Sequence, residues 1–238
     1  MKVTYIDHSG FLLETDTASL LFDFVKGALP ALPANKPLYV FVSHIHGDHY
    51  DRRIFTAVAG AAKKAGVPSL SYVLSSDIPA RDVPGALREQ TVFLSPHEVW
   101  SDNTLHVETL ASNDAGVAFV ISGKDAASFQ IYYAGDLNAW NWDGDAEDME
   151  LIRIYHEELA RIAGRTFDIA FIPLDPRLGE EYTQGITDFF DVCGCDALTV
   201  VPMHCWGKYE IIPKAKKKLA DTRIAERIAV YSKPGITD

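Results

Sequence analysis

The sequence of 238 residues is poor in cysteine and contains no long apolar run. Its three cysteines are Cys193, Cys195 and Cys205. Such an odd, sparse set argues against a disulfide framework and fits a reducing compartment, so we expect a cytoplasmic protein with inert, packed thiols. No segment approaches the roughly 18 apolar residues of a membrane-spanning helix, and residues 1–15 lack the apolar region of a signal peptide. We therefore expect no membrane partner.

Positive charge is also scarce. The 22 lysine and arginine residues are outnumbered by 33 aspartate and glutamate residues, which gives a formal net charge of -11. A surface of this sign repels polyanions, so nucleic acid is not expected as the main ligand. A small-molecule substrate is the expected partner, and the sequence gives no indication of the oligomeric state.

The apolar residues form short runs that predict strands, with helices placed after strands. Hydrophobic residues make up 47% of the chain, enough for one large core, and no repeat or linker divides it, so we expect a single domain over residues 1–238. The expected strands are 10–15, 18–24, 38–43, 70–74, 91–94, 104–110, 116–122, 129–135, 168–174 and 197–203. The expected helices are 51–66, begun at Asp51 and ended at Gly66, 146–164, 184–192 and 210–220. This order predicts an α/β fold of two mixed sheets with outer helices, a four-layer αββα sandwich.

Four candidate metal ligands follow the apolar run 38-LYVFV-42, in the stretch 44-HIHGDH-49. His44 and His46 can reach one metal ion, and Asp48 and His49 can reach a second point nearby. Imidazole nitrogen and carboxylate oxygen suit zinc, and Mn²⁺ or iron accepts the same set. Crowding these groups without a cation is costly, so we expect one or two metal ions, with zinc first. Gly47 is expected to let the backbone turn tightly between the ligands.

The stretch 44-HIHGDH-49 resembles the signature of the metallo-β-lactamase-fold hydrolases. The opening 8-HSGFLLET-15 resembles the subgroup related to L-ascorbate-6-phosphate lactonase. The stretch 133-YAGDLN-138 is similar to the later motif whose aspartate bridges two metal ions, which implies that role for Asp136. The stretch 200-VVPMHCW-206 is similar to the last motif, which implies His204 as a ligand.

One ligand of the resembling family is missing. The family has a third histidine for the first metal, and the matching stretch here is 110-LASNDAGVAFVI-121. Asn113 stands at the histidine's place, and asparagine is a poor zinc ligand. Asp114 is a better ligand if the loop presents it. We therefore expect the second site, with Asp48, His49 and His204, to be the tighter one.

This ligand set implies a metal-dependent hydrolase. A metal-activated hydroxide, formed because zinc lowers the pKa of bound water from 15.7 to about 7, attacks a carbonyl or phosphoryl centre. Asp48 would orient this hydroxide, and Asp136 would hold the metal ions. The expected substrate is a small cytosolic metabolite with an ester, lactone, thioester or phosphoester bond, and the resemblance favours an acidic or phosphorylated one.

Further residues are expected around the ligands. Asp23 and Ser43 are candidates for fixing the histidine tautomers. Arg177 can bind a substrate anion or pair with Asp175, and we favour the pair. The candidates for the substrate pocket are His8, Asn113, Trp140, Trp142, Arg177 and Lys208.

Two other interpretations stay open. The first is an iron-dependent redox enzyme on the same ligands, which the identity of the metal would reveal. The second is a non-catalytic metal-binding or sensor protein, because the first metal site lacks a histidine. Retention of Asp48, Asp136 and His204 argues against the second interpretation.

Overall fold

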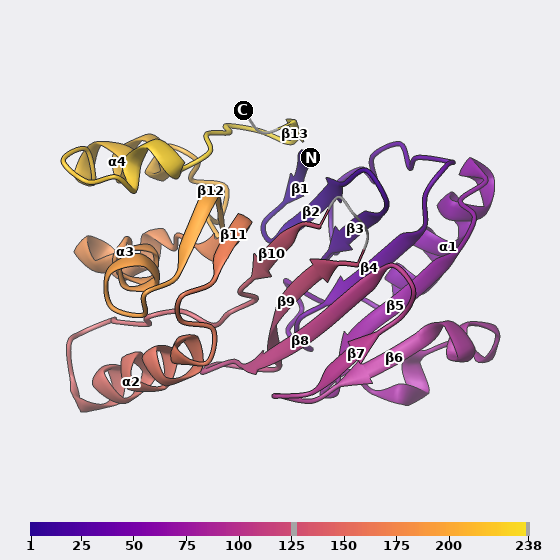
Figure 1. Cartoon of the computed structure of the whole chain (residues 1–238), viewed down its shortest axis with the longest axis horizontal. Helices are drawn as coiled ribbons and strands as arrows, with labels where there is room; N and C mark the ends of the chain where they lie inside the picture. The colour runs from indigo at the N-terminus through magenta and orange to yellow at the C-terminus, as the bar shows by residue number, and fades with distance from the viewer. Residues whose placement is uncertain (125–127, 237–238) are drawn as a thin grey trace.

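The computed structural model describes residues 1–124 and 128–236, and within them the chain forms two mixed sheets that face each other (Figure 1). The first sheet has seven strands in the order β13 (Gly235–Ile236), β1 (Lys2–Asp7), β2 (Gly10–Glu14), β3 (Ser19–Phe22), β4 (Leu38–Val42), β5 (Leu70–Ser75) and β6 (Thr91–Leu94). The second has six, in the order β12 (Asp196–Met203), β11 (Thr166–Pro173), β10 (Gln130–Tyr133), β9 (Val117–Gly123), β8 (Leu105–Ala111) and β7 (Val99–Ser101).

Helices cover the outer faces of the sheets. The α-helices are α1 (Arg53–Ala65), α2 (Ala146–Ala160), α3 (Gln184–Asp191) and α4 (Ile211–Lys218), and 3₁₀ turns span Ala80–Asp82, Gly85–Gln90, Pro176–Glu181 and Ala225–Arg227. In Figure 1, α1 lies outside the first sheet, and α2 and α3 lie on the far side of the second. This is the expected αββα sandwich. In the described part of the chain, no helix is long and apolar enough to cross a membrane.

Aromatic side chains fill the space between the sheets. Phe22 of β3 stacks on Tyr133 of β10 with ring centroids 4.4 Å apart, and Phe41 of β4 meets Phe119 of β9 at 5.2 Å. Residues Val40 and Val42 point the other way, into a second apolar cluster that includes residues of α1. Successive residues of a strand face opposite sides, so a strand buried on both sides must be apolar throughout, as 38-LYVFV-42 is.

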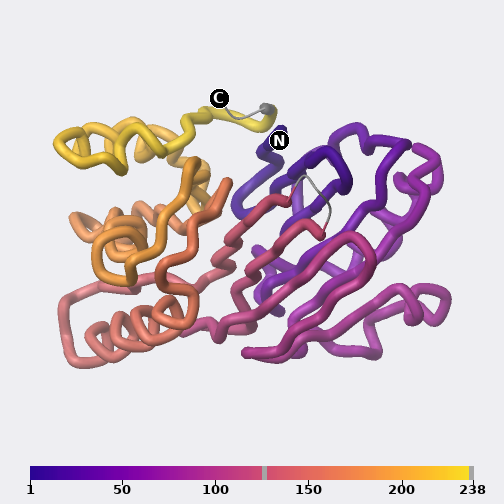
Figure 2. The backbone as a smooth tube through the Cα atoms, viewed as in Figure 1, coloured from indigo at the N-terminus to yellow at the C-terminus, as the bar shows by residue number. Residues whose placement is uncertain are grey.

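The structure corrects the sequence-based elements mainly at their ends. Strands β1, β7 and β13 were not expected, and β13 pairs antiparallel with β1, which brings the two ends of the chain side by side (Figure 2). Helix α1 begins at Arg53, and Asp51 accepts a hydrogen bond from the Arg53 backbone N–H. Gly66 ends this helix as expected, with φ of 73°. Helix α2 ends at Ala160, four residues before Gly164.

Candidate metal centre

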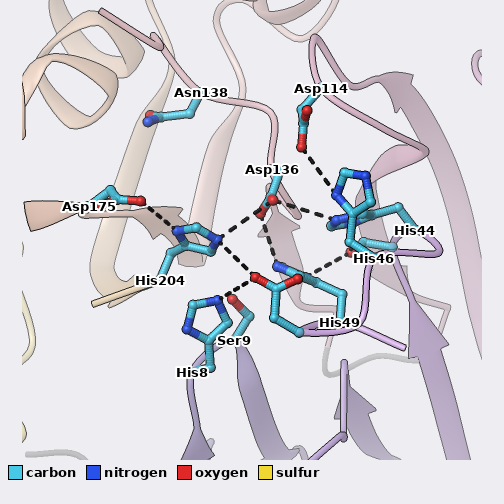
Figure 3. Close-up of polar contacts among 12 residues, drawn as sticks. His8, Ser9, His44, His46, His49, Asp114, Asp136, Asn138, Asp175 and His204 are labelled. Carbon is cyan, nitrogen blue, oxygen red and sulfur yellow. Dashed lines mark hydrogen bonds and ion pairs between the residues drawn. The ribbon is translucent and has the colours of Figure 1, made fainter. Parts of the chain in front are cut away.

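The candidate ligands meet at one edge of the sandwich, because parallel strands of both sheets end there. His44, His46, Asp48 and His49 follow β4, Asp136 follows β10, and His204 follows β12. Strands β3 and β4 run parallel to each other in the first sheet, and β10, β11 and β12 do so in the second, so within each sheet their carboxyl ends lie at one edge. Figure 3 shows His44, His49 and His204 directed at Asp136 from three directions.

The first group of candidate ligands contains His44, His46, Asp114 and Asp136, each with a ligand atom within 4.8 Å of the others. His46 Nδ1 lies 3.4 Å from Asp114 Oδ2, and His44 Nε2 lies 3.5 Å from Asp136 Oδ2. His44 is fully buried, whereas the side chains of His46 and Asp114 are 48% and 44% exposed. One half of this group therefore faces solvent.

The second group contains His8, Asp48, His49 and His204, again with ligand atoms within 4.8 Å of one another. Asp48 Oδ2 lies 3.3 Å from His8 Nε2 and 3.7 Å from His204 Nε2. His8, which we expected only in the substrate pocket, lies in this ligand group. It comes from the turn between β1 and β2, where its φ of 50° is uncommon for a residue other than glycine.

Asp136 connects the two groups. Its Oδ1 lies 3.1 Å from His49 Nε2, and its Oδ2 lies 3.5 Å from His44 Nε2 and 3.6 Å from His204 Nε2. The carboxylate thus faces one histidine of the first group and two of the second, which suits a bridging ligand.

Three histidine tautomers follow from the hydrogen bonds on the far side of each ring. His49 Nδ1 donates to Asp23 Oδ2 at 2.7 Å, and His204 Nδ1 donates to Asp175 Oδ2 at 2.9 Å. Ser43 Oγ donates a hydrogen bond to Asp23 Oδ2 at 2.6 Å. The same Ser43 hydroxyl oxygen therefore accepts a hydrogen bond from His44 Nδ1 at 2.9 Å. In each ring the second nitrogen, Nε2, is left for another partner.

These second nitrogens face carboxylate oxygens, at 3.1 to 3.6 Å from Asp136, but form no hydrogen bond in the described part of the chain. Within the described residues, Nε2 of His44, His49 and His204 and Oδ1 of Asp136 are buried without a hydrogen bond, as is Nε2 of His8. A buried polar atom without a partner costs free energy, and so many aimed at one place fit a bound cation. The residues present therefore fit a metal centre.

Electrostatics favour charged carboxylates here. The imidazoles of His204 and His8 hold the pKa of Asp48 well below its usual range. Burial by itself lowers the pKa of His49, but Asp136 and Asp23 overcome this effect and raise it well above the ordinary histidine value. For His44, burial prevails and its pKa is lowered, which keeps this imidazole neutral. Asp136 stays ionised because the histidines lower its pKa more than burial raises it.

Asn113 has a structural role. Its Nδ2 donates to the backbone carbonyls of Asn138 and Leu151, and its Oδ1 accepts from the Asn138 N–H. The side chain thus ties the loop before β9 to the loop after Asp136. Asp114, the next residue, faces His46 instead. Asn113 still lines the cavity above the ligands.

The absence of a side chain is required at Gly116, which the sequence analysis did not single out, and not at Gly47. A Cβ on Gly116 would lie 2.1 Å from the Ser43 carbonyl oxygen and 2.5 Å from His44 Cβ, and its φ is 65°. Gly116 therefore lets β9 approach the ligand strand. The chain turns at Gly47 as expected, but the residue has no positive φ and a Cβ there would meet nothing within 4 Å, so this turn does not require glycine.

A cavity of about 480 Å³ opens above both ligand groups. Its walls include Trp140, Trp142 and Arg177, as expected, and also Trp206, which sequence reasoning missed. Lys208, also a candidate for the substrate pocket, is exposed on the turn after His204 and is not among the residues that line this cavity. Trp140 is buried and donates its indole N–H to the Asp136 carbonyl, whereas Trp142 and Trp206 are 44% and 45% exposed.

The support that Asp175 gives to His204 was also missed, because the sequence pattern suggested only the Arg177 pair. That pair is present, with Arg177 Nη2 donating to Asp175 Oδ2 at 2.6 Å. A signal was available: Asp175 lies two residues after the end of β11, at the same edge as the ligands. The three cysteines are buried and free, as expected.

Comparison with known proteins gives consistent results. A family model described as a beta-lactamase superfamily domain matches residues 2–204. A UPF0173 metal-dependent hydrolase of Desulforamulus reducens is 28% identical, covering 99% of this chain and 98% of its own. Among solved structures, Igni18, a metallo hydrolase of Ignicoccus hospitalis, has a TM-score of 0.63 at 18% identity and covers 100% of this chain and 97% of that chain. CmlA, a diiron β-hydroxylase of Streptomyces venezuelae, has a TM-score of 0.54 at 12% identity, covering 85% of this chain and 44% of its own. These two similarities to solved structures show that the chain has the same fold.

Proposed function

The chain belongs to the beta-lactamase superfamily of metal-dependent hydrolases, and from this premise we propose that it cleaves an ester, lactone, thioester or phosphoester bond of a small molecule at a two-metal centre. One observation carries the proposal. The unpartnered Nε2 atoms of His44, His49 and His204 converge on Asp136 from opposite sides.

The donor sets suggest which residues hold each ion. His44, His46 and Asp114 would hold the first metal, and Asp48, His49 and His204 the second, with Asp136 shared. His8 Nε2 is buried, unpartnered and within the second group, so we add it to that site. We propose zinc, because imidazole and carboxylate donors in small numbers suit it, and Mn²⁺ or iron remains compatible with the first, more acidic group.

The chemistry divides between the metal and the chain. When bound, the metal supplies Lewis acidity, which acidifies a water molecule and polarises the oxygen of the bond to be cleaved. Asp48 is a carboxylate held in its charged form at the floor of the cavity. It can accept a hydrogen bond from the attacking water and pass a proton to the leaving group. The indole N–H of Trp140, bound to the Asp136 carbonyl, fixes the turn that presents Asp136.

The cavity supports a small molecule as the substrate. Its volume of about 480 Å³ is in the range of metabolite pockets, and indole rings make part of its wall. The net charge of -11 disfavours nucleic acid as the substrate. We also propose a cytoplasmic location, because three free cysteines fit a reducing compartment.

The test is a panel of carboxylic esters, lactones, thioesters and phosphoesters, assayed before and after removal of metal by a chelator. We expect hydrolysis of at least one bond class, its loss on chelation and its return with added zinc. His204→Ala should lower the metal content by about one ion per chain and the rate by at least about 100-fold.

A matched control is His106→Ala, because His106 lies on β8 and its contact with Glu108 is long, at 3.8 Å. This variant should keep full metal content and rate. Stoichiometric metal binding with no hydrolysis of any class would contradict the proposal and favour a non-catalytic metal-binding protein.

A further inference from the structure

The cavity above the metal ligands contains a guanidinium group that is fixed along one edge and free along the other. Arg177 Nε lies 2.9 Å from Asp175 Oδ2 and 3.0 Å from Asp175 Oδ1, and Nη2 donates to Oδ2 at 2.6 Å. Among the hydrogen bonds of residues 1–124 and 128–236, none uses Nη1 of Arg177. The edge that carries Nη1 therefore remains available for a ligand.

Two indole rings hold the plane of this guanidinium. Its central carbon lies 5.3 Å from the ring centroid of Trp142 and 4.6 Å from that of Trp206. Cation–π contacts of this kind fix orientation as well as adding attraction. Both rings are almost half exposed at the cavity wall, although burial of such large apolar groups is favourable. Their exposure suits a surface that is covered when a ligand binds.

The position of Arg177 relates directly to the metal ligands. Asp175 Oδ2 accepts from both Arg177 Nη2, at 2.6 Å, and His204 Nδ1, at 2.9 Å. The two nitrogens are therefore no more than 5.5 Å apart, and Nε2 of His204 faces the metal side. Arg177 and His204 also line the same cavity, so one small molecule bound there can contact both side chains.

The charges of the cavity wall make this arginine distinctive. The described residues that line it include four acidic ones, Asp48, Asp114, Asp136 and Glu147, and Arg177 is the single lysine or arginine among them. Its partner Asp175 also accepts from His204 and from the Trp206 indole N–H at 3.2 Å, so the hydrogen-bonding capacity of that carboxylate is shared among three side chains.

We infer that the free edge of Arg177, presented by Trp142 and Trp206, is a subsite for an oxyanion of the substrate. The substrate class is then small esters or lactones that carry a carboxylate or phosphate a few bonds from the cleaved bond, with their apolar part against the indoles. This inference rests on the proposed hydrolase function. The ion pair with Asp175 accounts for the hydrogen bonds of Arg177 Nε and Nη2. It does not account for the free Nη1 or for the two exposed indole rings.

The test compares three substrates of similar size: 4-nitrophenyl glutarate, which carries a free carboxylate, its neutral methyl ester, and a 4-nitrophenyl ester with a phosphate in place of the carboxylate. The measured quantity is the ratio of kcat/KM for each anionic ester to that for the neutral one. We expect this ratio to exceed one in the wild-type protein and to fall about 10- to 100-fold in Arg177→Gln, since charge-assisted hydrogen bonds contribute that much. The ester with the larger fall identifies the anion.

Arg153→Gln is the matched control, because Arg153 lies on the exposed face of α2 and pairs with Glu150 at 2.7 Å and with Glu157. It should leave the ratio unchanged. Metal content is measured for both variants. An equal loss of rate on charged and neutral esters in Arg177→Gln, with or without loss of metal, would overturn the subsite and leave Arg177 as support for Asp175.

Failure of the proposed function is distinguishable from failure of the subsite. If the wild-type protein cleaves none of the esters, the hydrolase proposal fails for this bond class, and calorimetric binding of glutarate then tests the subsite alone. Glutarate binding at least tenfold weaker in Arg177→Gln supports the subsite, and equal binding overturns it. Should Arg177→Gln fail to fold, competition in the wild-type protein decides: glutarate must inhibit better than its neutral dimethyl ester.

Discussion

Asp175 accepts a 2.9 Å hydrogen bond from Nδ1 of His204, and both side chains are almost completely buried. The same carboxylate oxygen also accepts from Arg177 and from Trp206. One side chain thus orients a candidate metal ligand and part of the cavity wall. The Asp23 carboxylate has the matching position behind His49, at 2.7 Å.

Replacement of Asp175 by asparagine should weaken metal binding at the second group. An amide cannot accept from all the donors that the carboxylate accepts from, so the His204 ring loses its fixed tautomer. We expect a loss of about 10- to 100-fold in metal affinity, measured by competition with a chromogenic chelator. Asp188→Asn is the control, because Asp188 makes the same kind of bond with His156, 2.8 Å long, away from the cavity. Equal metal affinities in the two variants would show that Asp175 does not support metal binding through His204.

Metal binding should tighten as the pH rises. In the metal-free protein the pKa values of His49 and His204 are both raised, because nearby carboxylates overcome the effect of burial. Protons on these rings compete with the metal below the raised pKa values and leave as the pH increases through them. The affinity should therefore still be rising above about pH 6.5, where an ordinary histidine is already half deprotonated. Calorimetry in buffers of different ionisation enthalpy should show proton release at pH 7.5. A metal affinity that stays constant from about pH 6 to 8 would contradict the predicted increase of affinity with pH.

Alanine should have opposite consequences at two glycines near the ligands. Gly116→Ala puts a methyl group 2.1 Å from the Ser43 carbonyl oxygen at a positive φ, so we expect a loss of at least ~2 kcal/mol in the free energy of unfolding. Gly47→Ala meets nothing within 4 Å and should change that free energy by less than ~0.5 kcal/mol. Urea unfolding of both metal-free variants measures the difference. Similar values for the two would show that the close approach at Gly116 is unimportant.

Much of the fold and half of the site could be predicted from local patterns. The continuous apolar run before 44-HIHGDH-49 indicated a strand buried on both sides, and the ligands follow it directly. Ser43, next to the ligands in sequence, and Asp23, which came from the family resemblance, were candidates for fixing the histidine tautomers, and both contact the histidine rings. Asp136 and His204 came from resemblance to later motifs, since residues so distant in sequence meet only through the packing of the two sheets.

The remainder depended on three-dimensional arrangement. His8 joins the second ligand group because the β1–β2 turn takes a φ of 50°, which no residue type in that turn signals strongly. Trp206 reaches Arg177 only because the chain reverses after His204, again at a positive φ. Strands of two or three residues, such as β13 and β7, carry too few side chains to show an alternating pattern.

The most direct test of the two-metal account is the metal content per chain, determined by elemental analysis on protein purified without added metal. Wild-type protein should contain about two ions per chain. Asp114→Ala should retain about one, because the first group loses one of its two carboxylates, and His49→Ala should lose the ion of the second group. A single ion in the wild-type protein that is retained in Asp114→Ala and lost in His49→Ala would contradict the two-metal centre and place one metal at the second group alone.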